Sequence, residues 1–583
     1  MADAPRALPA PAKPSFFKRL FLTKLDKSTR RIKLIGFAFL LCYGIIAGRL
    51  IHFGLTPQAP TSGSGSGWDT VAAARPDIVD RHGEILATDI KVTSVFADPL
   101  QLIDKDEAVD QLTSVLPDLN ADELLKRLHS RKGFVWIKRA ITQSQQNEIY
   151  HLGLPGVGFV QENKRIYPNG PIAAHVLGYA NINGIGISGL EKYIDSQGLA
   201  DLHVAGFKLT RDDLKPVVTS LDLRATYAVR DELAKGIEKY KAKAGAAAIL
   251  DVETGEVIAM ASLPDFDPNE PAQALDPEHI NRMTVGTYEM GSTFKALTIA
   301  MALDDGKATL NTQLDARDSL RYGRYTIHDF HATHRILTVP EVFVHSSNIG
   351  TAKLALMVGV DGHKAFLRKM GQLTRLRTEL PESAEPIVPK NWGELNTMTI
   401  AFGQGLNVAP LQALMAVGAL VNGGILIKPT FLKRNEAENG VRVVKPETSE
   451  ALRYLMRLNA EVGSARKADV QGYFVGGKTG TADKIVHGHY SPDQVLTTFM
   501  AIVPADKPKY LYLTLLDRPQ ALPSTDGQHT AAWNAGEICG ALIERTAPLL
   551  DLPPRQTPPP EPFPLLAKSG YTAANQPATS GEQ

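Results

Sequence analysis

The sequence predicts an α+β protein of several domains, in which a membrane-spanning helix precedes a β-rich domain and a larger domain with one mixed sheet flanked by helices. Three observations indicate this fold. An apolar run over 34–55 follows a basic tail, short β-like runs fill 68–216, and strand segments bracket the helical patterns of 217–552. Strands at both ends of a segment with helices between them are typical of one sheet covered by helices.

Residues 1–33 are expected to form a basic cytoplasmic tail, because they contain nine Lys or Arg residues against two Asp. The apolar run 34–55 is 22 residues long, which is enough to cross a bilayer. The long basic lead and the lack of a persuasive cleavage site favour a retained anchor over a cleaved signal peptide. The positive-inside rule then places everything after residue 55 outside the membrane. Arg49, late in the run, either reaches the outer interface or faces a partner helix.

The segments that flank the two domains are low in complexity. A Gly/Ser-rich flexible linker is expected at 56–67, and a disordered Pro-rich tail at 553–583. The two cysteines, Cys42 and Cys539, lie inside the anchor and far beyond it, so no disulfide is expected. A net charge of +1 over 583 residues indicates no polyanionic partner, so nucleic-acid binding is not expected.

The chain is long enough for two domains with sizeable cores. The domain at 68–216, which we call the pedestal, has a helical patch near 106–130 among its short β-like runs. The larger domain has long helical patterns in its middle. Its predicted strands are 246–250, 256–260, a segment running into Lys478, 498–503 and 510–516.

Three short motifs with reactive side chains follow one another in the larger domain. Together they supply a nucleophile with a base one helical turn away, a second hydroxyl with an amide, and a cationic strand with hydroxyls. This set predicts acyl transfer through an active-site serine on a peptide that ends in a free carboxylate. The motifs are Ser292-Thr293-Phe294-Lys295, Ser346-Ser347-Asn348 and Lys478-Thr479-Gly480-Thr481.

The first motif is ambiguous by itself, because Ser-x-x-Lys also occurs at Ser15 and Ser464. Ser292 differs from both in preceding an apolar helix predicted over 293–303. A serine at a helix start gains from the positive end of the helix dipole, and Lys295 at i+3 lies on the same face. Ser15 lies in the basic tail and Ser464 in a polar connection. The alternative for Ser292 is an ordinary helix cap.

Three other patterns suggest different chemistry. Residues 472–479 match a phosphate loop, but no helical period follows Lys478 and the apolar residues 473–475 predict a buried strand. The Gly-rich stretch 184–189 fits a dinucleotide fingerprint without a convincing strand before it, so a flexible turn is expected. His328, Asp329, His331 and His334 form a cluster whose spacing matches no standard zinc site, so a polar loop near the cleft is favoured over a metal site.

With these residues in place, the chain resembles a class B penicillin-binding protein, a membrane-anchored peptidoglycan transpeptidase, and most resembles the septal type. It departs from the family pattern at Pro76, His82 and Met290, where Gly, Asn and commonly Pro are expected. Besides the three motifs, the resemblance rests on 75–83, 165–168 and 189–191 in the pedestal and on 254–262, 266–269, 281–282, 288–292, 403–405 and 410–412 in the larger domain.

The resemblance implies a penicillin-binding and serine β-lactamase-like transpeptidase domain above a dimerisation-type pedestal. Ser292 would attack the penultimate D-Ala of a stem peptide ending in D-Ala-D-Ala, and Lys295 would take its proton. Ser346, between Lys295 and Lys478, would relay a proton to the departing D-Ala amine. Asn348 would hold the substrate amide, and Lys478, Thr479, Gly480 and Thr481 would line the site of the terminal carboxylate. Backbone amides of Ser292 and Thr481 would form the oxyanion hole. β-Lactams would acylate the same serine.

The resemblance also sets expectations for partners. No glycosyltransferase element occurs in the sequence, so a separate membrane glycosyltransferase and other divisome proteins are expected, with no cofactor and no metal. The 186-residue separation of Ser292 from Lys478 favours a division enzyme over an elongation enzyme. Two other functions stay open: a D,D-carboxypeptidase or β-lactamase-like hydrolase, and a non-catalytic divisome scaffold or β-lactam sensor.

Overall fold

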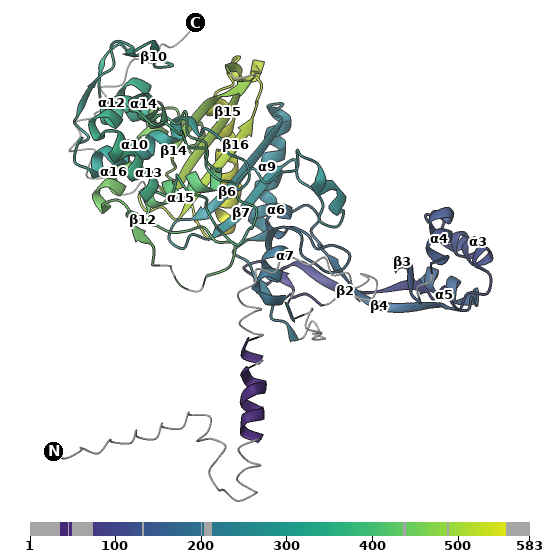
Figure 1. Cartoon of the computed structure of the whole chain (residues 1–583). Helices are drawn as coiled ribbons and strands as arrows, with labels where there is room; N and C mark the ends of the chain where they lie inside the picture. The colour runs from purple at the N-terminus through teal and green to yellow at the C-terminus, as the bar shows by residue number, and fades with distance from the viewer. Residues whose placement is uncertain are drawn as a thin grey trace, which may run out of the picture. The chain divides into compact units, whose positions relative to one another are not determined.

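The computed structural model describes residues 35–44, 46–48, 74–130, 133–199, 201–202, 213–434, 436, 439–486 and 489–555, and it divides the chain into two units, Met1–Asp69 and Thr70–Gln583 (Figure 1). In the first unit, 35–44 and 46–48 are helical and exposed. No helix within the described ranges is both long and apolar enough to cross a membrane. The basic tail, the linker, the tail beyond residue 555 and the rest of the expected anchor at 34–55 lie outside the described residues.

The pedestal is built on a twisted sheet in which one long strand pairs with three others. Strand β2 (Ile85–Ala97) pairs antiparallel with β1 (Ile78–Val79), with β4 (Val157–Ile166) along most of its length, and with β3 (Val135–Ile141) at its far end. Strand β5 (Val217–Val218) closes the other edge by pairing parallel with β1. This sheet therefore mixes strand directions.

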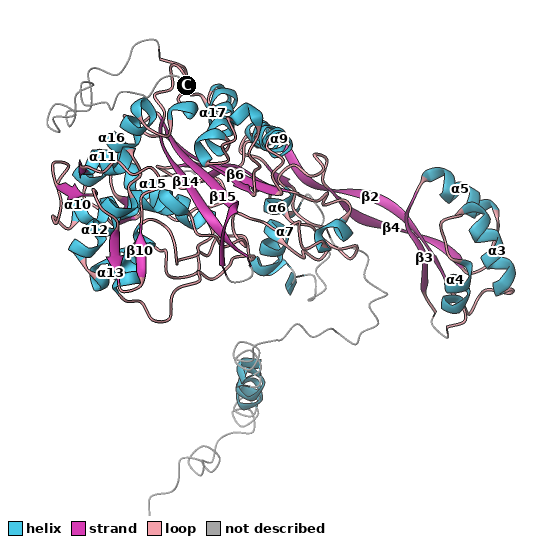
Figure 2. Cartoon of the chain, turned by 90° about the horizontal axis from the view of Figure 1, so that it is seen from above, coloured by secondary structure: helices cyan, strands magenta, loops and turns pink. Residues whose placement is uncertain are grey.

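The far end of the β2/β4 ribbon forms an outer lobe with α3 (Lys105–Val115), α4 (Ala121–Leu128) and α5 (Gln143–His151) (Figures 1 and 2). Each helix starts at a side chain that accepts backbone N–H groups, as expected of N-caps. These caps are Asp104, Asn120 and Thr142. The lobe has a hydrophobic core of its own, formed by Val95, Ala97, Leu102, Ala108, Val109, Leu112, Leu116, Leu124, Leu128, Val135, Ile137, Ile141 and Ile149.

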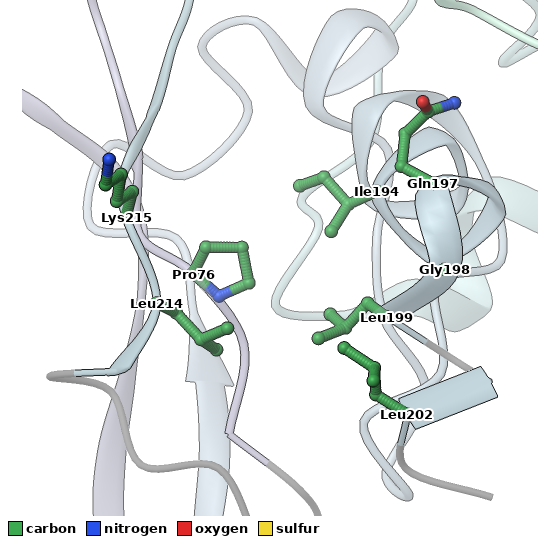
Figure 3. Close-up of a pocket in the computed structure, with 8 residues that line it drawn as sticks. All are labelled: Pro76, Ile194, Gln197, Gly198, Leu199, Leu202, Leu214 and Lys215. Atoms are coloured by element: carbon green, nitrogen blue, oxygen red, sulfur yellow. The ribbon is translucent and has the colours of Figure 1, made fainter. Parts of the chain in front are cut away.

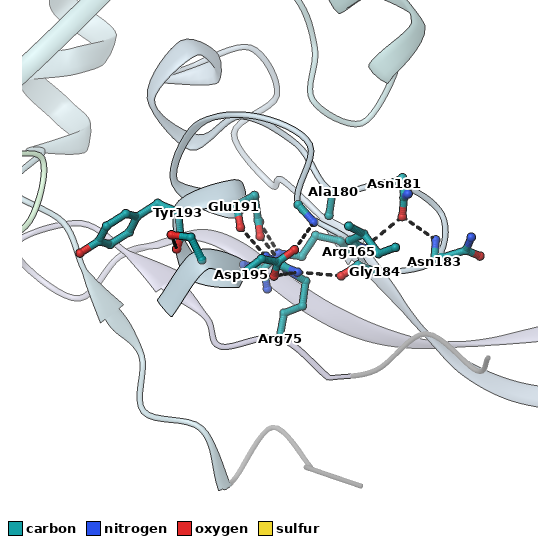
Figure 4. A network of polar contacts seen from close by, with 12 residues as sticks. Arg75, Arg165, Ala180, Asn181, Asn183, Gly184, Glu191, Tyr193 and Asp195 are labelled. Carbon is teal, nitrogen blue, oxygen red and sulfur yellow. Dashed lines mark hydrogen bonds and ion pairs between the residues drawn. The ribbon is translucent and has the colours of Figure 1, made fainter. Parts of the chain in front are cut away.

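A buried network of ion pairs holds the inner end of the pedestal together (Figure 4). Arg75 donates to Glu191 at 2.7 Å and to Asp195 at 2.6 Å, while Arg165 donates to the second oxygen of Glu191 at 2.6 Å and to Asp89 at 3.2 Å. Glu191 lies on the short helix α7 (Gly189–Ile194), which follows α6 (Ala174–Leu177). The motif segments 75–83, 165–168 and 189–191 thus meet at one carboxylate.

The larger domain contains a five-stranded sheet in the order β14 (Gly476–Val486), β15 (His489–Val503), β16 (Tyr510–Asp517), β6 (Ala244–Asp251) and β7 (Val257–Leu263). All four pairings are antiparallel, so the expectation of a mixed sheet in this domain is wrong. The reason is the short connections within β6–β7 and β14–β15–β16, since strands joined by tight turns run in opposite directions.

Apolar side chains point from both faces of this sheet, because alternate residues of a strand face opposite ways. Helices α9 (Leu223–Lys239) and α17 (Ala535–Thr546) pack on one face, whereas α15 (Pro410–Val421) and most of α16 (Pro446–Val462) belong to the core of the other face (Figure 2). The helix-flanked sheet is thereby confirmed. On β16, Leu511, Leu513 and Leu515 belong to one core and Tyr510, Tyr512 and Leu516 to the other.

The remaining helices pack around α10 (Lys295–Asp304), which itself contacts α15 and α16, and the remaining strands form three two-stranded sheets. These helices are α11 (Val339–Val344), α12 (Asn348–Val358), α13 (Val360–Lys369) and α14 (Glu394–Ala401). The short strands are β8 (Gln313–Asp315), β9 (Leu320–Tyr322), β10 (Tyr325–Ile327), β11 (Ile336–Thr338), β12 (Ile425–Leu426) and β13 (Val441–Arg442).

Candidate active site

Ser292 lies in a short 3₁₀ turn, η4 (Gly291–Phe294), directly before α10. The expected α-helix therefore begins two residues later than predicted, and Ser292 does not cap it. Gly291 has a φ of +54°, and a Cβ there would lie 2.8 Å from the carbonyl oxygen of Thr481. Close packing against β14 thus tightens the first turn. The Ser292 hydroxyl has no hydrogen-bond partner among the described residues, which leaves it available to a substrate.

Gly480 allows β14 to pass close to this turn. A Cβ at Gly480 would lie 2.6 Å from the carbonyl oxygen of Met290 and would also collide with Thr498. Every other residue has a Cβ, so any substitution would push the strand away from the turn. The glycine between the two threonines of the third motif is therefore what places Lys478 and Thr481 beside Ser292.

Two buried lysines converge on the hydroxyl of Ser346. Lys295 comes from α10 and Lys478 from β14, and each is 1% exposed. The Nζ atom of each lies 3.0 Å from Ser346 Oγ, and Lys295 Nζ also donates to the Ser346 carbonyl oxygen. The ring of Phe343 lies 5.6 Å from Lys478 Nζ. Two lysines from separate motifs are thus both within hydrogen-bonding distance of the serine of a third motif.

Burial shifts both lysines toward the neutral amine. Loss of water lowers the pKa of Lys478 to about 7. The pKa of Lys295 falls well below its ordinary value through burial first and the charge of Lys478 second, while Asp329 opposes the change. A neutral amine can accept a proton, which an ordinary lysine at neutral pH cannot. The pair therefore provides a base inside the site.

The second motif forms a sharp turn into α12. Ser346 has a φ of +54°, a conformation that is strained for a residue with a Cβ. Ser347 caps α12 by accepting the backbone N–H of Gly350 at 2.9 Å. Asn348 is half-buried, and its amide nitrogen donates to the carbonyl oxygen of His328 at 2.9 Å.

The hydroxyls of the two threonines of the third motif have partners in different parts of the chain. The Thr481 hydroxyl accepts the backbone N–H of Ala531 at 3.1 Å. The Thr479 hydroxyl lies 2.8 Å from the hydroxyl of Ser464. Buried Asn459, on α16, donates to the carbonyl oxygen of Gly477 at 2.8 Å and accepts the backbone N–H of Ser464 at 3.1 Å.

Ser464 and Asn459 are site residues that reasoning from the sequence missed. From the sequence, Ser464 is expected in a polar connection outside the site, although it belongs to a Ser-x-x-Lys match. Ser464 lies 14 residues before Lys478, and this spacing does not predict a contact. The two segments meet only because the chain folds back between α16 and β14. Residues 473 and 475 are buried as expected, but the strand begins only at Gly476, because Phe474 adopts a left-handed turn conformation.

The His328 cluster packs against the second motif. Asp329 accepts hydrogen bonds from the Ser347 hydroxyl at 2.7 Å and from the Ile349 backbone N–H at 2.9 Å. His328 contacts the Ser319 hydroxyl at 2.8 Å. Within the described residues, no group of three His, Cys, Asp or Glu side chains could hold a metal ion. The cluster is a polar loop beside the site.

A pocket of about 470 Å³ lies elsewhere, in the pedestal (Figure 3). None of the site residues lines it, so it has no part in the chemistry. Its lining is mostly apolar, with one charged residue, and consists of Pro76, Ile194, Gln197, Gly198, Leu199, Leu202, Leu214 and Lys215.

Comparison with known families agrees with this arrangement. Residues 245–540 match the family described as "Penicillin binding protein transpeptidase domain", and residues 70–198 match "Penicillin-binding Protein dimerisation domain". The chain belongs to the penicillin-binding protein transpeptidase family. The family indicated by the three motifs is thereby confirmed.

Three similar proteins illustrate how much of this penicillin-binding protein is shared. The "Probable peptidoglycan D,D-transpeptidase FtsI" of Caulobacter vibrioides is 37% identical over 90% of this chain and 89% of its own length. The "Probable peptidoglycan D,D-transpeptidase PenA" of Neisseria meningitidis is 33% identical over 78% of this chain and 81% of its own. The solved transpeptidase domain of Burkholderia pseudomallei penicillin-binding protein 3 aligns with a TM-score of 0.53 at 29% identity, covering 58% of this chain and 98% of that domain.

Proposed function

We propose that this penicillin-binding protein is a peptidoglycan D,D-transpeptidase that cross-links stem peptides through an acyl-enzyme on Ser292. The observation that carries the proposal is the convergence of Lys295 and Lys478 on Ser346, each at 3.0 Å, next to the turn that holds Ser292. Relatives that share most of the chain are named as probable enzymes of this activity.

In the first step, Ser292 Oγ attacks the carbonyl carbon of the penultimate D-Ala while neutral Lys295 takes the hydroxyl proton. The backbone N–H groups of Ser292 and Thr481 stabilise the resulting oxyanion, and each donor contributes on the order of 3 kcal/mol. Collapse of the tetrahedral intermediate breaks the peptide bond. The departing D-Ala amine receives its proton through Ser346, whose hydroxyl lies between the two lysines.

The lysine of the third motif has a second role toward the substrate. A carboxylate placed beside Lys478, Thr479 and Thr481 favours the charged form of the lysine and raises its pKa again. Substrate binding therefore keeps Lys478 charged beside the carboxylate and Ser346, while the proton that Lys295 took from Ser292 passes through Ser346 to the leaving amine. Asn348 presents its amide group to the peptide backbone of the stem.

The acyl-enzyme is resolved by an amine from a neighbouring stem, which attacks the ester carbonyl and releases Ser292. The new peptide bond is the cross-link. Water competes with this amine, so slow hydrolysis accompanies the reaction. β-Lactams acylate Ser292 as well, and their acyl-enzymes turn over slowly.

We further propose that the protein works at the division septum, held by the segment 34–55 with its two large domains outside the cytoplasmic membrane. The length of that apolar run and the basic residues before it support the anchor. The 186-residue separation of Ser292 from Lys478 and the likeness to the Caulobacter protein named FtsI support the division role. Divisome proteins and a glycosyltransferase are the expected partners.

The decisive experiment uses the full-length protein in detergent with a fluorescent penicillin and with stem-peptide donors and amine acceptors. Wild-type protein is expected to stay acylated for many minutes and to form cross-linked product, whereas Ser292→Ala does neither. Ser196→Ala, an exposed pedestal serine, is the matched control. Rapid turnover of the penicillin would instead indicate a hydrolase. Normal growth of cells that carry Ser292→Ala, together with failure of cells that lack the anchor, would indicate a scaffold.

A further inference from the structure

The polar loop that contains His328 and Asp329 forms hydrogen bonds with the second motif. Asp329 accepts two hydrogen bonds, from Ser347 Oγ at 2.7 Å and from the Ile349 backbone N–H at 2.9 Å. The His328 carbonyl oxygen accepts a third, from Asn348 at 2.9 Å. Two consecutive loop residues therefore hold all three residues that follow Ser346.

These hydrogen bonds act next to the turn at Ser346, where the backbone is strained. Ser346 has a φ of +54°, a left-handed conformation that is strained for a residue with a Cβ and persists only where the surroundings enforce it. Both the hydroxyl and the carbonyl oxygen of Ser346 are acceptors for Lys295, and the hydroxyl is an acceptor for Lys478. If the turn relaxed, the hydroxyl would leave its place between the two amines.

Asp329 also brings a negative charge to a site with two buried lysines. Burial lowers the pKa of Lys295 most, and the charge of Lys478 from β14 lowers it next. Asp329 acts third and raises this pKa, because its negative charge favours the charged lysine. His345, at the end of α11, is another titratable group near Asp329. Burial lowers the pKa of His345 first and neighbouring Arg335 lowers it next, while Glu341 and Asp329 oppose them.

We propose that Asp329 is a positioning residue of the active site, which holds the strained turn at Ser346 in place through Ser347 and Ile349 and brings a negative charge near Lys295. The inference rests on the proposed function of Ser292, Lys295 and Ser346. Asp329 does not touch the substrate; it acts through Ser347, Ile349 and the field at Lys295.

The experiment separates the hydrogen bonds from the charge. Asp329→Asn keeps an oxygen for the Ile349 N–H and an amide that can donate to Ser347 Oγ, but it removes the charge. Asp329→Ala removes both. The rate of acylation by a fluorescent penicillin is measured with full-length protein from pH 5 to pH 9, together with the midpoint of thermal unfolding.

For Asp329→Asn, we expect the acidic limb of the acylation profile to move to lower pH by roughly one unit, because Lys295 then loses its proton more easily. The thermal midpoint should stay within a few degrees of wild type. For Asp329→Ala, we expect an acylation rate lower by about 100-fold at every pH, because the turn at Ser346 is no longer held. If the Asn variant restores most of that rate, the hydrogen bonds of residue 329 to Ser347 and Ile349 hold the turn, as proposed.

Two control variants sharpen the result. Asp318→Asn removes an exposed carboxylate close by in the sequence and should leave the profile unchanged. His345→Gln, combined with Asp329→Asn, should retain the shift of the acidic limb; loss of the shift would assign it to His345 and overturn the proposal. An unshifted profile in Asp329→Asn, or a wild-type rate in Asp329→Ala, would overturn it as well. Undiminished acylation of Ser292→Ala would overturn the proposed function itself.

Discussion

The pedestal and the active site both bury cationic side chains, and they treat them in opposite ways. Arg75 in the pedestal and Lys295 in the active site are each 1% exposed. Arg75 has carboxylates at 2.7 Å and 2.6 Å, whereas the hydrogen-bond partners of Lys295 are the neutral hydroxyl and carbonyl oxygens of Ser346. Each site holds a cation removed from water, but only the cation in the pedestal has a carboxylate at hydrogen-bonding distance.

The pairing decides the protonation state. At Arg165, burial acts to lower the pKa, but Glu191 and Asp89 outweigh it and the pKa rises. At Lys478, burial acts alone and lowers the pKa to about 7. A buried cation with a carboxylate at hydrogen-bonding distance is thus a fixed structural charge. A buried cation without one is a proton acceptor near neutral pH.

The comparison is tested most strongly by replacing Lys295 with Met. Loss of the general base is expected to lower the rate of penicillin acylation by about 10³-fold, or roughly 4 kcal/mol in activation free energy. The thermal midpoint should not fall, because an unpaired buried lysine costs stability. Lys307→Met, at an exposed lysine after α10, is the control and should change neither quantity. A large fall in the midpoint of Lys295→Met would contradict the view that this lysine is unpaired.

In the pedestal, Glu191→Ala should lower the stability of the protein, in contrast to Lys295→Met. It leaves Arg75 and Arg165 buried without their shared carboxylate, which is expected to cost about 3–5 kcal/mol of stability. Thermal unfolding of the full-length protein measures this cost. Glu123→Ala breaks an ion pair whose carboxylate side chain is 71% exposed, and it should cost less than about 0.5 kcal/mol. Equal losses of stability for Glu191→Ala and Glu123→Ala would contradict the view that the buried carboxylate contributes more than the exposed one.

The pH dependence of stability provides a third test. The pKa of Lys478 in the folded protein, about 7, lies below its ordinary value of 10.5, so the unfolded chain binds more protons between these values. Stability therefore rises with pH through this window and is lowest below pH 7, where the buried lysine is charged. From pH 7 to pH 8.5, we expect a gain on the order of 2 kcal/mol, seen as a higher thermal midpoint. In Lys478→Met this gain should shrink; an undiminished gain would assign it to other groups.

The smallest effect is expected at Ser464, whose hydroxyl contacts the third motif at Thr479. A Ser464 hydroxyl that donates to Thr479 Oγ1 turns the Thr479 proton toward the substrate carboxylate. Ser464→Ala should slow acylation by carboxylate-bearing penicillins about fivefold, equivalent to one neutral hydrogen bond of about 1 kcal/mol. Penicillin esters, which lack the charged carboxylate, should be affected less. Ser464→Thr should restore the rate. Equal slowing with acid and ester would show that Ser464 does not act through the carboxylate.

Much of the fold could be predicted from local pattern. The strand segments predicted at 246–250 and 510–516 correspond to β6 (Ala244–Asp251) and β16 (Tyr510–Asp517), because apolar β-rich runs bounded by turns are a short-range signal. The direction of pairing could not be predicted in the same way. It depends on which strands become neighbours, and the sheet of the larger domain proved antiparallel throughout.

The sequence by itself determined the set of reactive groups and the family, because residue type and short spacing are properties of neighbouring positions along the chain. Ser292 comes three residues before Lys295, and Gly480 follows Thr479, whatever the rest of the fold does. Only the tertiary structure decided that both lysines meet at one hydroxyl, that Ser464 touches Thr479, and that Asp329 holds the turn at Ser346. These contacts join separate elements, and the exclusion of water that makes the lysines neutral exists only once those elements have packed together.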